Sequence, residues 1–276
     1  MNYYERQAEL GIVEQFCRSM ENAHLSANTM DQRRRFLRSF VTNVGIGGDR
    51  AAIEAWLGKK KIKPKTLGCW ISHLNAFYVW AIATDVVESN PTVDIPRPKV
   101  IRKPPRPLPE KELAYALKKA NAHMKCLMLL GAFAGLRCGE IVMLDREDII
   151  EDAWLHVPQT KANKERLVPM HPDVYDALLD MGLPETGPLF TRYDGSRSHG
   201  DDIAQQIGKF MQKNGVKFSA ISLRHYFGAQ TLKACHDVRV VQELMGHKYI
   251  GTTLNYARFD RQAGKQAVGS LSLLVD

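Results

Sequence analysis

Residues 90–107 hold six of the 13 prolines in the chain and separate two long stretches of helical pattern. Proline has no backbone donor and a fixed φ, so this segment cannot be a helix interior or a central strand. We expect an extended, semi-rigid linker between two folded units. Its cations would face either solvent or a phosphate backbone. They are Arg97, Lys99, Arg102, Lys103 and Arg106.

Residues 1–89 show apolar side chains at three- and four-residue spacings, which is typical of amphipathic helices. The pattern predicts four short helices, of which the second begins near Ser26 or Thr29 and the third covers 49–57. We therefore expect a small all-α domain. Five lysines precede the fourth helix, where they would contact DNA phosphates or simply form a solvated turn. They are Lys59, Lys60, Lys61, Lys63 and Lys65.

Residues 108–276 are predicted to be mainly α with a small antiparallel β section. Residues 152–158 and 165–170 alternate well enough for a hairpin, and "QTKANK" joins them. Helical patterns surround this hairpin, and the stretch "HMKCLMLLGAFAG" is so apolar that its helix should be buried.

Several function classes are excluded by what the sequence lacks. No apolar run is long enough to cross a bilayer and the first residues do not resemble a signal peptide, so we expect a cytoplasmic protein. Five scattered cysteines predict reduced core thiols and no metal site. Nucleotide-binding glycine loops and compact acidic clusters are absent too, so we expect no cofactor. The net charge of +8 is a weak indication of a polyanionic partner.

Two arginines are predicted to lie near helix N-termini. Arg137 falls in the joint after the buried helix, and Arg224 falls in the first turn of a helix if Ser222 is its N-cap. A cation there is locally unfavourable, and an anion such as phosphate, held between the two arginines, would reverse that balance. The alternative is that each arginine pairs with a carboxylate such as Glu140 or Asp148.

The stretch "MGHKYIGTTLNY" places His247 nine residues before Tyr256. Gly246 is predicted to end one helix, and Thr252 to cap a short second helix that carries the tyrosine. The turn between the helices would let both side chains reach one phosphate. The alternative is that both are packing residues.

Four motifs, "GLRCGE", "TKANKERLVPM", "SLRHYFGAQTL" and "MGHKYIGTTLNYA", occur in the order and approximate spacing of the tyrosine recombinase (phage integrase) family. The resemblance covers residues 108–260, and the four helices before the linker are similar to the core-binding (SAM-like) domain of that family. It implies a core-type DNA-binding domain at 1–89, the basic linker at 90–107 and a catalytic domain at 108–276. Because the helices begin near the first residue, the expected form is a minimal one without an arm-binding domain.

The resemblance also implies catalytic roles. Tyr256 would attack the scissile phosphate and form a 3′-phosphotyrosyl link, which releases a 5′-hydroxyl. Arg137 and Arg224 would hold the non-bridging oxygens, whose charge grows in the transition state. Lys161 would protonate the departing 5′-oxygen, with Lys164 as the competing candidate.

The remaining implied roles belong to residues around the arginines. His247 would donate a hydrogen bond to the phosphate, His225 would support proton transfer, and Glu140 would support Arg137 without taking part in the chemistry. The sequence departs from the family at Ile221, where the family usually has a histidine. Either His225 or a water takes over that step, or the enzyme is slow, or the register assigned here is shifted.

The implied function is site-specific recombination that integrates or excises phage or mobile-element DNA, without metal or ATP. The expected partners are double-stranded DNA at specific attachment or core sites and further copies of the chain, with a tetramer in the synapse. Alternatives are a chromosome-dimer-resolving (Xer-like) recombinase, a type IB topoisomerase and a DNA-binding protein with a decayed site. The apolar tail at 269–276 would pack either on its own domain or on a neighbouring copy.

Overall fold

The computed structural model describes residues 3–22, 27–99, 105–150, 154–159, 165–254 and 256. The chain forms two compact units, Met1–Arg102 and Lys103–Asp276. Across the described ranges, no helix has both the length and the apolar character that a bilayer crossing requires.

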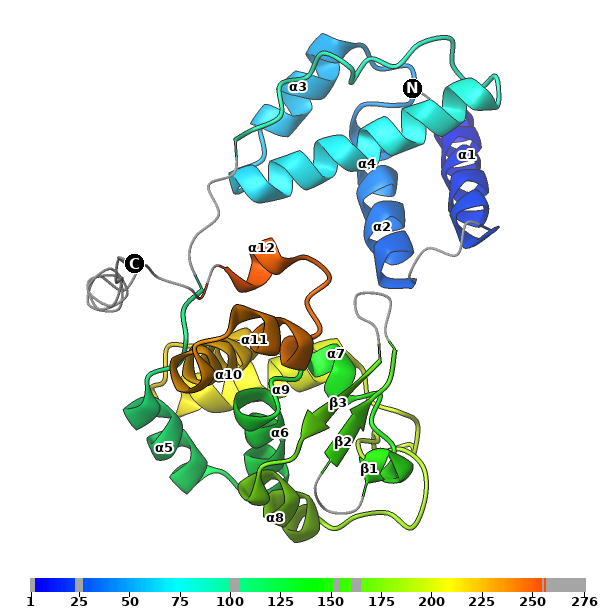
Figure 1. Ribbon diagram of the computed structural model, residues 1–276. Helices are drawn as coiled ribbons and strands as arrows, with labels where there is room; N and C mark the ends of the chain where they lie inside the picture. The colour runs from blue at the N-terminus through cyan, green and yellow to red at the C-terminus, as the bar shows by residue number, and fades with distance from the viewer. Residues whose placement is uncertain are drawn as a thin grey trace, which may run out of the picture. The chain divides into compact units, whose positions relative to one another are not determined.

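The first unit contains the four predicted helices (Figure 1): α1 (Tyr3–Asn22), α2 (Ala27–Asn43), α3 (Arg50–Gly58) and α4 (Pro64–Ala83). Local signals explain two of the starts. The side chain of Asp49 caps α3 by accepting a hydrogen bond from the backbone nitrogen of Ala52 at 2.8 Å. Pro64 opens α4 at a position where its missing N–H is not needed.

The core of the first unit is rich in aromatic side chains. Phe16 and Phe77 pack edge to face with ring centroids 5.5 Å apart, and Phe40 packs in the same way against Trp56. The hydroxyl of Tyr78 donates to the carbonyl oxygen of Ile46 at 2.9 Å, which satisfies the polar end of a buried ring.

The first part of the predicted linker belongs to this core. Ile95 is 7% exposed and packs with the buried apolar residues, while Thr92 donates to the side chain of Asn90 through both its backbone nitrogen and its hydroxyl. The buried side chain of Ile95, and a hydrogen bond of 3.1 Å from the side chain of Asn90 to that of Asn75 in α4, therefore attach residues 90–95 to the helices. Arg97 and Lys99 are exposed beyond this point, whereas Arg102 and Lys103 lie outside the described residues.

The second unit is built around α6 (Ala122–Phe133), which packs against both α8 (Pro172–Met181) and α10 (Ala220–Cys235) (Figure 1). As predicted, α6 is buried along most of its length, including every residue from Cys126 to Ala132. The other helices of this unit are α5 (Glu110–Lys119), α7 (Cys138–Ile141), the 3₁₀ helix η1 (Arg146–Asp148), α9 (Gly200–Lys213), α11 (Val238–Met245) and α12 (Ile250–Thr253).

The second unit also has a three-stranded antiparallel sheet in the order β1 (Ile149–Ile150), β2 (Trp154–Val157) and β3 (Arg166–Pro169). The predicted hairpin is formed by β2 and β3, with Leu155 opposite Val168. The sequence pattern did not predict β1, because two residues are too short for alternation to appear. The hairpin tip with Lys161 and Lys164 lies outside the described residues, as does the tail at 269–276.

Two helix boundaries differ from the prediction. The N-cap of α10 is Ser219 and not Ser222, so Arg224 lies in the second turn and not at the positive end of the helix dipole. The N-cap of α12 is Tyr249 and not Thr252. This helix ends at Thr253, and Tyr256 follows it in a turn closed by a hydrogen bond of 2.9 Å from the backbone nitrogen of Tyr256 to the carbonyl oxygen of Thr253.

The five cysteines are all free thiols, but only Cys17 and Cys126 are buried. Cys69 and Cys235 are exposed, so the expectation of core thiols was wrong for these two. Each lies on a helix surface, where spacing along the sequence is a weak guide to burial.

Candidate active site

The centre of the site is a buried carboxylate, Glu140, which is 2% exposed. It lies in the first turn of α7, where one oxygen accepts a hydrogen bond of 2.9 Å from the backbone nitrogen of Arg137. The other oxygen accepts one of 3.0 Å from Nη1 of the same arginine. Glu140 therefore caps its own helix, and it also orients Arg137, as the resemblance implied.

Arg224 reaches the same carboxylate from α10. It is 2% exposed, and its Nη1 donates to Oε2 of Glu140 at 3.2 Å and to the carbonyl oxygen of Gly135 at 2.5 Å. Its Nη2 donates to the carbonyl oxygen of Met245, at the end of α11. The guanidinium thus links α10 to the segment from Gly135 to Glu140 and to the end of α11.

Gly135 is required at this junction. Its φ is +67°, and a Cβ there would lie 2.4 Å from Cδ1 of Phe227. Both the backbone conformation and the close approach of the ring exclude other residues. The carbonyl that binds Arg224 is therefore positioned by a glycine.

A third arginine, which was not predicted from the sequence as a site residue, completes the cluster. Arg166, at the start of β3, has a side chain that is 8% exposed. Its Nη2 and Nη1 donate to the two oxygens of Glu140 at 3.1 and 3.3 Å, and its Nε donates to the carbonyl oxygen of Leu244 at 2.8 Å. One feature of the sequence could have indicated its burial. Arg166 is two residues from the buried Val168, and side chains at that spacing share one face of a strand.

The electrostatics of this cluster favour an anion. Burial alone would raise the pKa of Glu140, but hydrogen bonding and charge from Arg166, together with the charge of Arg224, hold it below its usual value. Burial and the charge of Arg137 lower the pKa of Arg224 to about 9, which leaves it protonated at neutral pH. Three guanidinium groups around one carboxylate leave an excess of positive charge that suits a phosphate.

Tyr256 lies beside this cluster with its hydroxyl 2.8 Å from Nδ1 of His225. Burial, followed by the charge of Arg224, lowers the pKa of His225 and keeps the ring neutral, so it can accept the phenolic proton. Burial raises the pKa of Tyr256, while the charges of Arg224 and Arg137 act in the opposite direction. The phenol is therefore protonated at neutral pH and needs a base.

His247 also lies close to the tyrosine. Its ring is nearly parallel to that of Tyr256, with centroids 6.3 Å apart, and its Nδ1 is 2.8 Å from the hydroxyl of Thr253. Burial, then Arg224 and Arg137, lower its pKa to about 4. The neutral ring can accept from the threonine at Nδ1 and keep Nε2–H as a donor. The turn before it depends on Gly246, which ends α11 with a φ of +60°.

The structure thus brings together five of the six predicted catalytic residues: Arg137, Arg224, His225, His247 and Tyr256. The sixth, Lys161, lies outside the described residues. Asp148, the alternative partner for an arginine, instead pairs with His156 at 2.7 Å.

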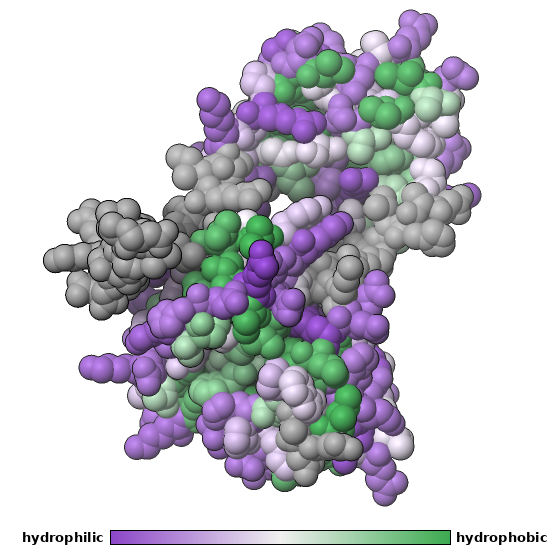
Figure 2. Space-filling model, in the orientation of Figure 1, coloured by the Kyte–Doolittle hydropathy of each residue, from purple (hydrophilic) through white to green (hydrophobic). Residues whose placement is uncertain are grey.

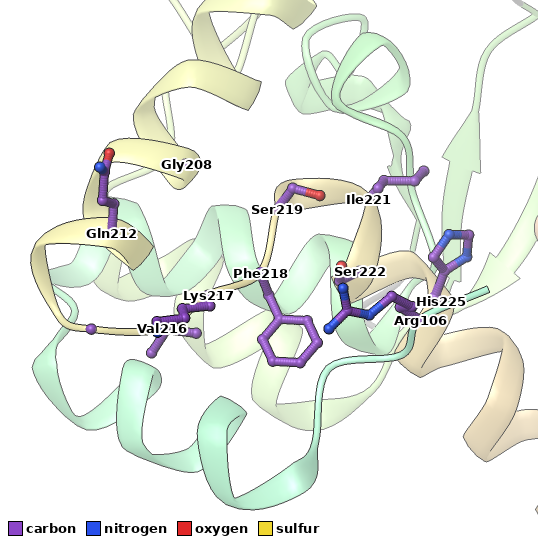
Figure 3. A pocket seen from close by; sticks show the side chains of 11 residues that line it. Arg106, Gly208, Gln212, Val216, Lys217, Phe218, Ser219, Ile221, Ser222 and His225 are labelled. Atoms are coloured by element: carbon purple, nitrogen blue, oxygen red, sulfur yellow. The ribbon is translucent and has the colours of Figure 1, made fainter. Parts of the chain in front are cut away.

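Ile221 lies one turn from His225 on α10, and its side chain is 48% exposed. Both residues line a groove of about 730 Å³ (Figure 3), together with Phe218 and the predicted DNA-binding residue Arg106. The guanidinium carbon of Arg106 is 5.6 Å from the centre of the Phe218 ring. A histidine at position 221 would therefore open onto the same groove as His225.

In the first unit, the five predicted DNA-binding lysines surround the joint between α3 and α4. Lys59, Lys61, Lys63 and Lys65 are exposed, while Nζ of Lys60 lies 5.5 Å from the centre of the Trp56 ring. Lys63 is the N-cap of α4, so positive side chains gather at the positive end of a helix dipole. This concentration is unfavourable for the isolated chain and suits a phosphate backbone.

Comparison with known proteins connects this geometry to a family. The sequence profile of the phage integrase family matches residues 108–263, which include the cluster around Glu140 and Tyr256 but neither Arg106 nor the lysines of the first unit. The chain belongs to the phage integrase family. It is therefore a tyrosine recombinase, an enzyme of site-specific recombination.

Named relatives and solved structures agree with this membership. Tyrosine recombinase XerC of Neisseria meningitidis is 29% identical over 74% of this chain and 72% of the relative. Tyrosine recombinase XerD of Staphylococcus saprophyticus is 28% identical over 91% and 94%.

Among solved structures, a lambda integrase dimer bound to a COC′ core site matches with a TM-score of 0.74, 15% identity, and coverage of 91% of this chain and 79% of that chain. The Tn1549 transposon integrase in complex with a circular intermediate DNA matches with a TM-score of 0.70, 20% identity, and coverage of 95% and 99%. The fold, with an N-terminal core-binding domain and a C-terminal catalytic domain, is confirmed.

Proposed function

We propose that this chain cleaves and rejoins double-stranded DNA at specific sites, with Tyr256 as the nucleophile. The observation that carries the proposal is the hydrogen bond of 2.8 Å between the Tyr256 hydroxyl and a neutral His225, beside three arginines that share one carboxylate. Attack on a phosphodiester monoanion requires a nucleophile next to a base, and positive charge that neutralises the phosphate. The site provides both.

In the cleavage step, the Tyr256 oxygen forms a bond to phosphorus and the bond from phosphorus to the 5′-oxygen breaks. His225 accepts the phenolic proton. Lys161 on the hairpin tip donates a proton to the departing 5′-oxygen. The product is a 3′-phosphotyrosyl link and a free 5′-hydroxyl. Because the link conserves the phosphodiester energy, the reverse attack by a 5′-hydroxyl rejoins a strand without ATP.

The two arginines and His247 hold the phosphate during this step. Arg137 retains an exposed fraction of 32% in its side chain and can meet the DNA directly. Arg224 is bound to backbone carbonyls on two sides and supplies a fixed charge. His247 donates from Nε2, because its Nδ1 is used by Thr253.

The proposed substrate is duplex DNA with specific core or attachment sites, of phage or mobile-element origin, in the cytoplasm of a bacterial host. Support comes from the lambda and Tn1549 integrases, whose solved complexes contain core-site DNA and circular intermediate DNA. We propose that copies of the chain assemble on such DNA and form a tetramer in the synapse. The five lysines around the joint between α3 and α4, of which Lys65 lies in the first turn of α4, would contact the DNA backbone together with Arg97, Lys99 and Arg106.

The relatives named XerC and XerD favour a second candidate, resolution of chromosome dimers in the manner of the Xer recombinases. The two functions use the same chemistry and differ in the DNA on which the protein acts. Sequencing the DNA that becomes covalently attached in bacteria that express the protein decides between them. Attachment at one chromosomal locus supports the second candidate, and attachment at the ends of an integrated element supports the first.

The chemistry is tested by incubating the protein in EDTA with a random-sequence duplex library and separating covalent adducts under denaturing conditions. Wild type should yield adducts enriched in one sequence, and Tyr256→Phe should yield none. His225→Gln should slow attachment by a factor on the order of 10²–10⁴, because a general base is removed. Absence of any wild-type adduct, or one that needs added magnesium, would contradict the proposal.

The variant Ile221→His tests the departure from the family pattern. Because position 221 opens onto the same groove as His225, the new imidazole should preserve or raise the rate of attachment. Ile221→Gln, which is of similar length and does not titrate near neutral pH, is the matched control. Complete loss of attachment in a folded Ile221→His protein would show that this position is wrongly assigned.

A further inference from the structure

We propose that Arg166 is a positioning residue that holds the two catalytic arginines and the segment before His247 in one reactive arrangement. The inference rests on the proposed function, because it concerns the residues assigned there to phosphate binding. Arg166 is the third guanidinium on Glu140. It lies within the motif "TKANKERLVPM", but none of the roles that the resemblance implies is assigned to it.

The geometry gives Arg166 a role different from that of its two neighbours. Both of its terminal nitrogens face the carboxylate of Glu140, at 3.1 and 3.3 Å, and its Nε faces the carbonyl oxygen of Leu244 at 2.8 Å. All three hydrogen-bonding nitrogens are therefore used within the protein, and its side chain is 8% exposed. By contrast, Arg137 keeps about a third of its side chain accessible for the DNA.

Arg166 also fixes the end of α11. Its bond to Leu244 is adjacent to the bond that Arg224 makes to Met245, so two guanidinium groups bind two successive carbonyls. The last carbonyls of a helix lack internal partners and carry partial negative charge, which suits such cations. His247 follows Met245 by only two residues. These bonds therefore fix the backbone just before His247 and with it the position of the imidazole.

The position of Arg166 in the sequence links this arrangement to the hairpin. It is the first residue of β3, and it follows by five residues the lysine that is proposed to protonate the departing oxygen. One side chain therefore connects the strand that follows the proposed general acid in the sequence to the carboxylate that Arg137 and Arg224 share. Loss of that connection should misplace the reacting groups without removing any of them.

A purely structural role is the competing explanation, and Arg197 supplies a matched control. Its Nη1 donates to the carbonyl oxygen of Val142 at 2.9 Å and its Nη2 to Asp145 at 2.7 Å. Like Arg166, it binds one backbone carbonyl and one carboxylate in the same unit. Among the described residues, neither Val142 nor Asp145 forms a hydrogen bond or ion pair with Arg137 or Arg224, so Arg197→Met should reduce stability and leave the chemistry unchanged.

The experiment measures covalent attachment of full-length protein to the duplex that wild type selects from the random library. Two quantities are determined for each variant: the rate at saturating DNA, and the DNA concentration that gives half of this rate. Each is corrected for the folded fraction. Arg166→Met should lower the saturating rate by about a hundredfold, because a misplacement of about 1 Å suffices for such a loss. The half-saturating concentration should remain within about threefold of wild type. Arg166→Lys keeps the charge but cannot bind the carboxylate and the carbonyl together, so it should recover only part of the rate.

The pH dependence of the Arg166→Lys and Arg166→Met rates gives a second readout. Glu140 faces Arg137, Arg166, Arg224 and the nearby His247, and the first three hold it ionised. Removing the Arg166 guanidinium raises the pKa of Glu140, so its ionised form is lost at a higher pH. The acidic limb of the rate profile should therefore move to higher pH in Arg166→Met and less in Arg166→Lys.

The outcomes separate the two proposals. If wild type forms no adduct, the proposed function fails. If wild type forms adducts and folded Arg166→Met matches it in saturating rate and pH profile, this inference alone is overturned. If Arg166→Met does not fold, Arg166→Lys decides the question, and a rate and pH profile equal to those of Arg197→Met would overturn the inference.

A check without DNA is the imidazole pKa of His247, measured by NMR. This pKa should rise from about 4 when the charge of Arg166 is removed.

Discussion

Both units have an apolar core, but only the second buries charged side chains among the residues that the structure describes. Apart from His73 and Thr92, the buried side chains described in the first unit are apolar or aromatic, and its ion pairs lie at partly exposed positions. The second unit buries Glu140, Arg224, His247 and Thr253 next to one another. Figure 2 shows hydrophilic and hydrophobic side chains mixed on the visible face of each unit, so the surface in this view does not reveal the difference.

This difference indicates which unit performs the chemistry. Aromatic packing contributes stability and defines a surface, whereas buried charge has a desolvation cost and is weak evidence for stability. A cluster of three cations around one carboxylate is therefore better explained by the anion it can bind than by the fold it supports. Changes to the two cores should have correspondingly different consequences.

The largest effect is expected from Glu140→Gln. The substitution leaves Arg137, Arg166 and Arg224 without their shared anion, and breaking a buried ion pair on one side costs about 3–5 kcal/mol. Covalent attachment should fall below detection. Chemical denaturation followed separately in the two units should show the loss only in the second unit. A stable, active Glu140→Gln protein would remove the contrast between the two cores.

A smaller loss of stability is expected from Gly135→Ala. The positive φ and the approach of Phe227 together should cost about 2–4 kcal/mol. The carbonyl that binds Arg224 would also move, so attachment by the folded fraction should slow. Gly182→Ala is the control, because Gly182 has a positive φ but open space around it. Equal losses in the two variants would mean that strain alone, and not the contact with Phe227, sets the effect.

Lowering the pH should reduce the stability of the catalytic unit through protonation of His247. Its pKa is about 4 in the folded protein against an ordinary 6.5, so the unfolded chain binds the extra proton as the pH falls through this window. The stability that the neutral ring contributes is present above pH 6.5 and is lost towards pH 4, by up to about 3 kcal/mol. The difference between wild type and His247→Gln in the free energy of unfolding should shrink over this range. A difference that does not change with pH would show that His247 titrates normally.

The smallest effect is expected in the aromatic core. Tyr78→Phe removes one hydroxyl that donates to a buried carbonyl oxygen, that of Ile46, and should cost about 1–2 kcal/mol. The variant should attach to DNA at the wild-type saturating rate, because the change lies in the first unit. A change in that rate would show that the core of the helical unit controls the chemistry.

The sequence predicted most helices and the hairpin because their signals are local. Apolar spacing indicated the four helices of the first unit and the buried α6, and strand alternation indicated β2 and β3. The N-cap of α10 was misplaced because Ser219 and Ser222 are equally good candidates, and the backbone selects the first. The linker was extended too far because Ile95 lies among prolines, and only the folded helices show that it is buried.

The site was predicted by resemblance and not by chemistry alone. Motif order identified Arg137, Arg224, His225, His247 and Tyr256, but no motif states that Arg137 and Arg224 share one carboxylate. Arg166 was missed because a lone arginine in a strand usually faces solvent. Its partners, Glu140 and Leu244, are 26 and 78 residues away in the sequence, and such pairings become visible only in three dimensions.

Sharing Glu140 among three arginines has an evolutionary consequence. A lineage cannot replace this carboxylate by placing a new one beside a single arginine, because two other cations would remain unmatched. The residues of the cluster are therefore expected to persist or disappear together as the enzyme diverges. In copies that have lost their activity, a neutral residue at position 140 would mark the point at which the whole arrangement was released from selection.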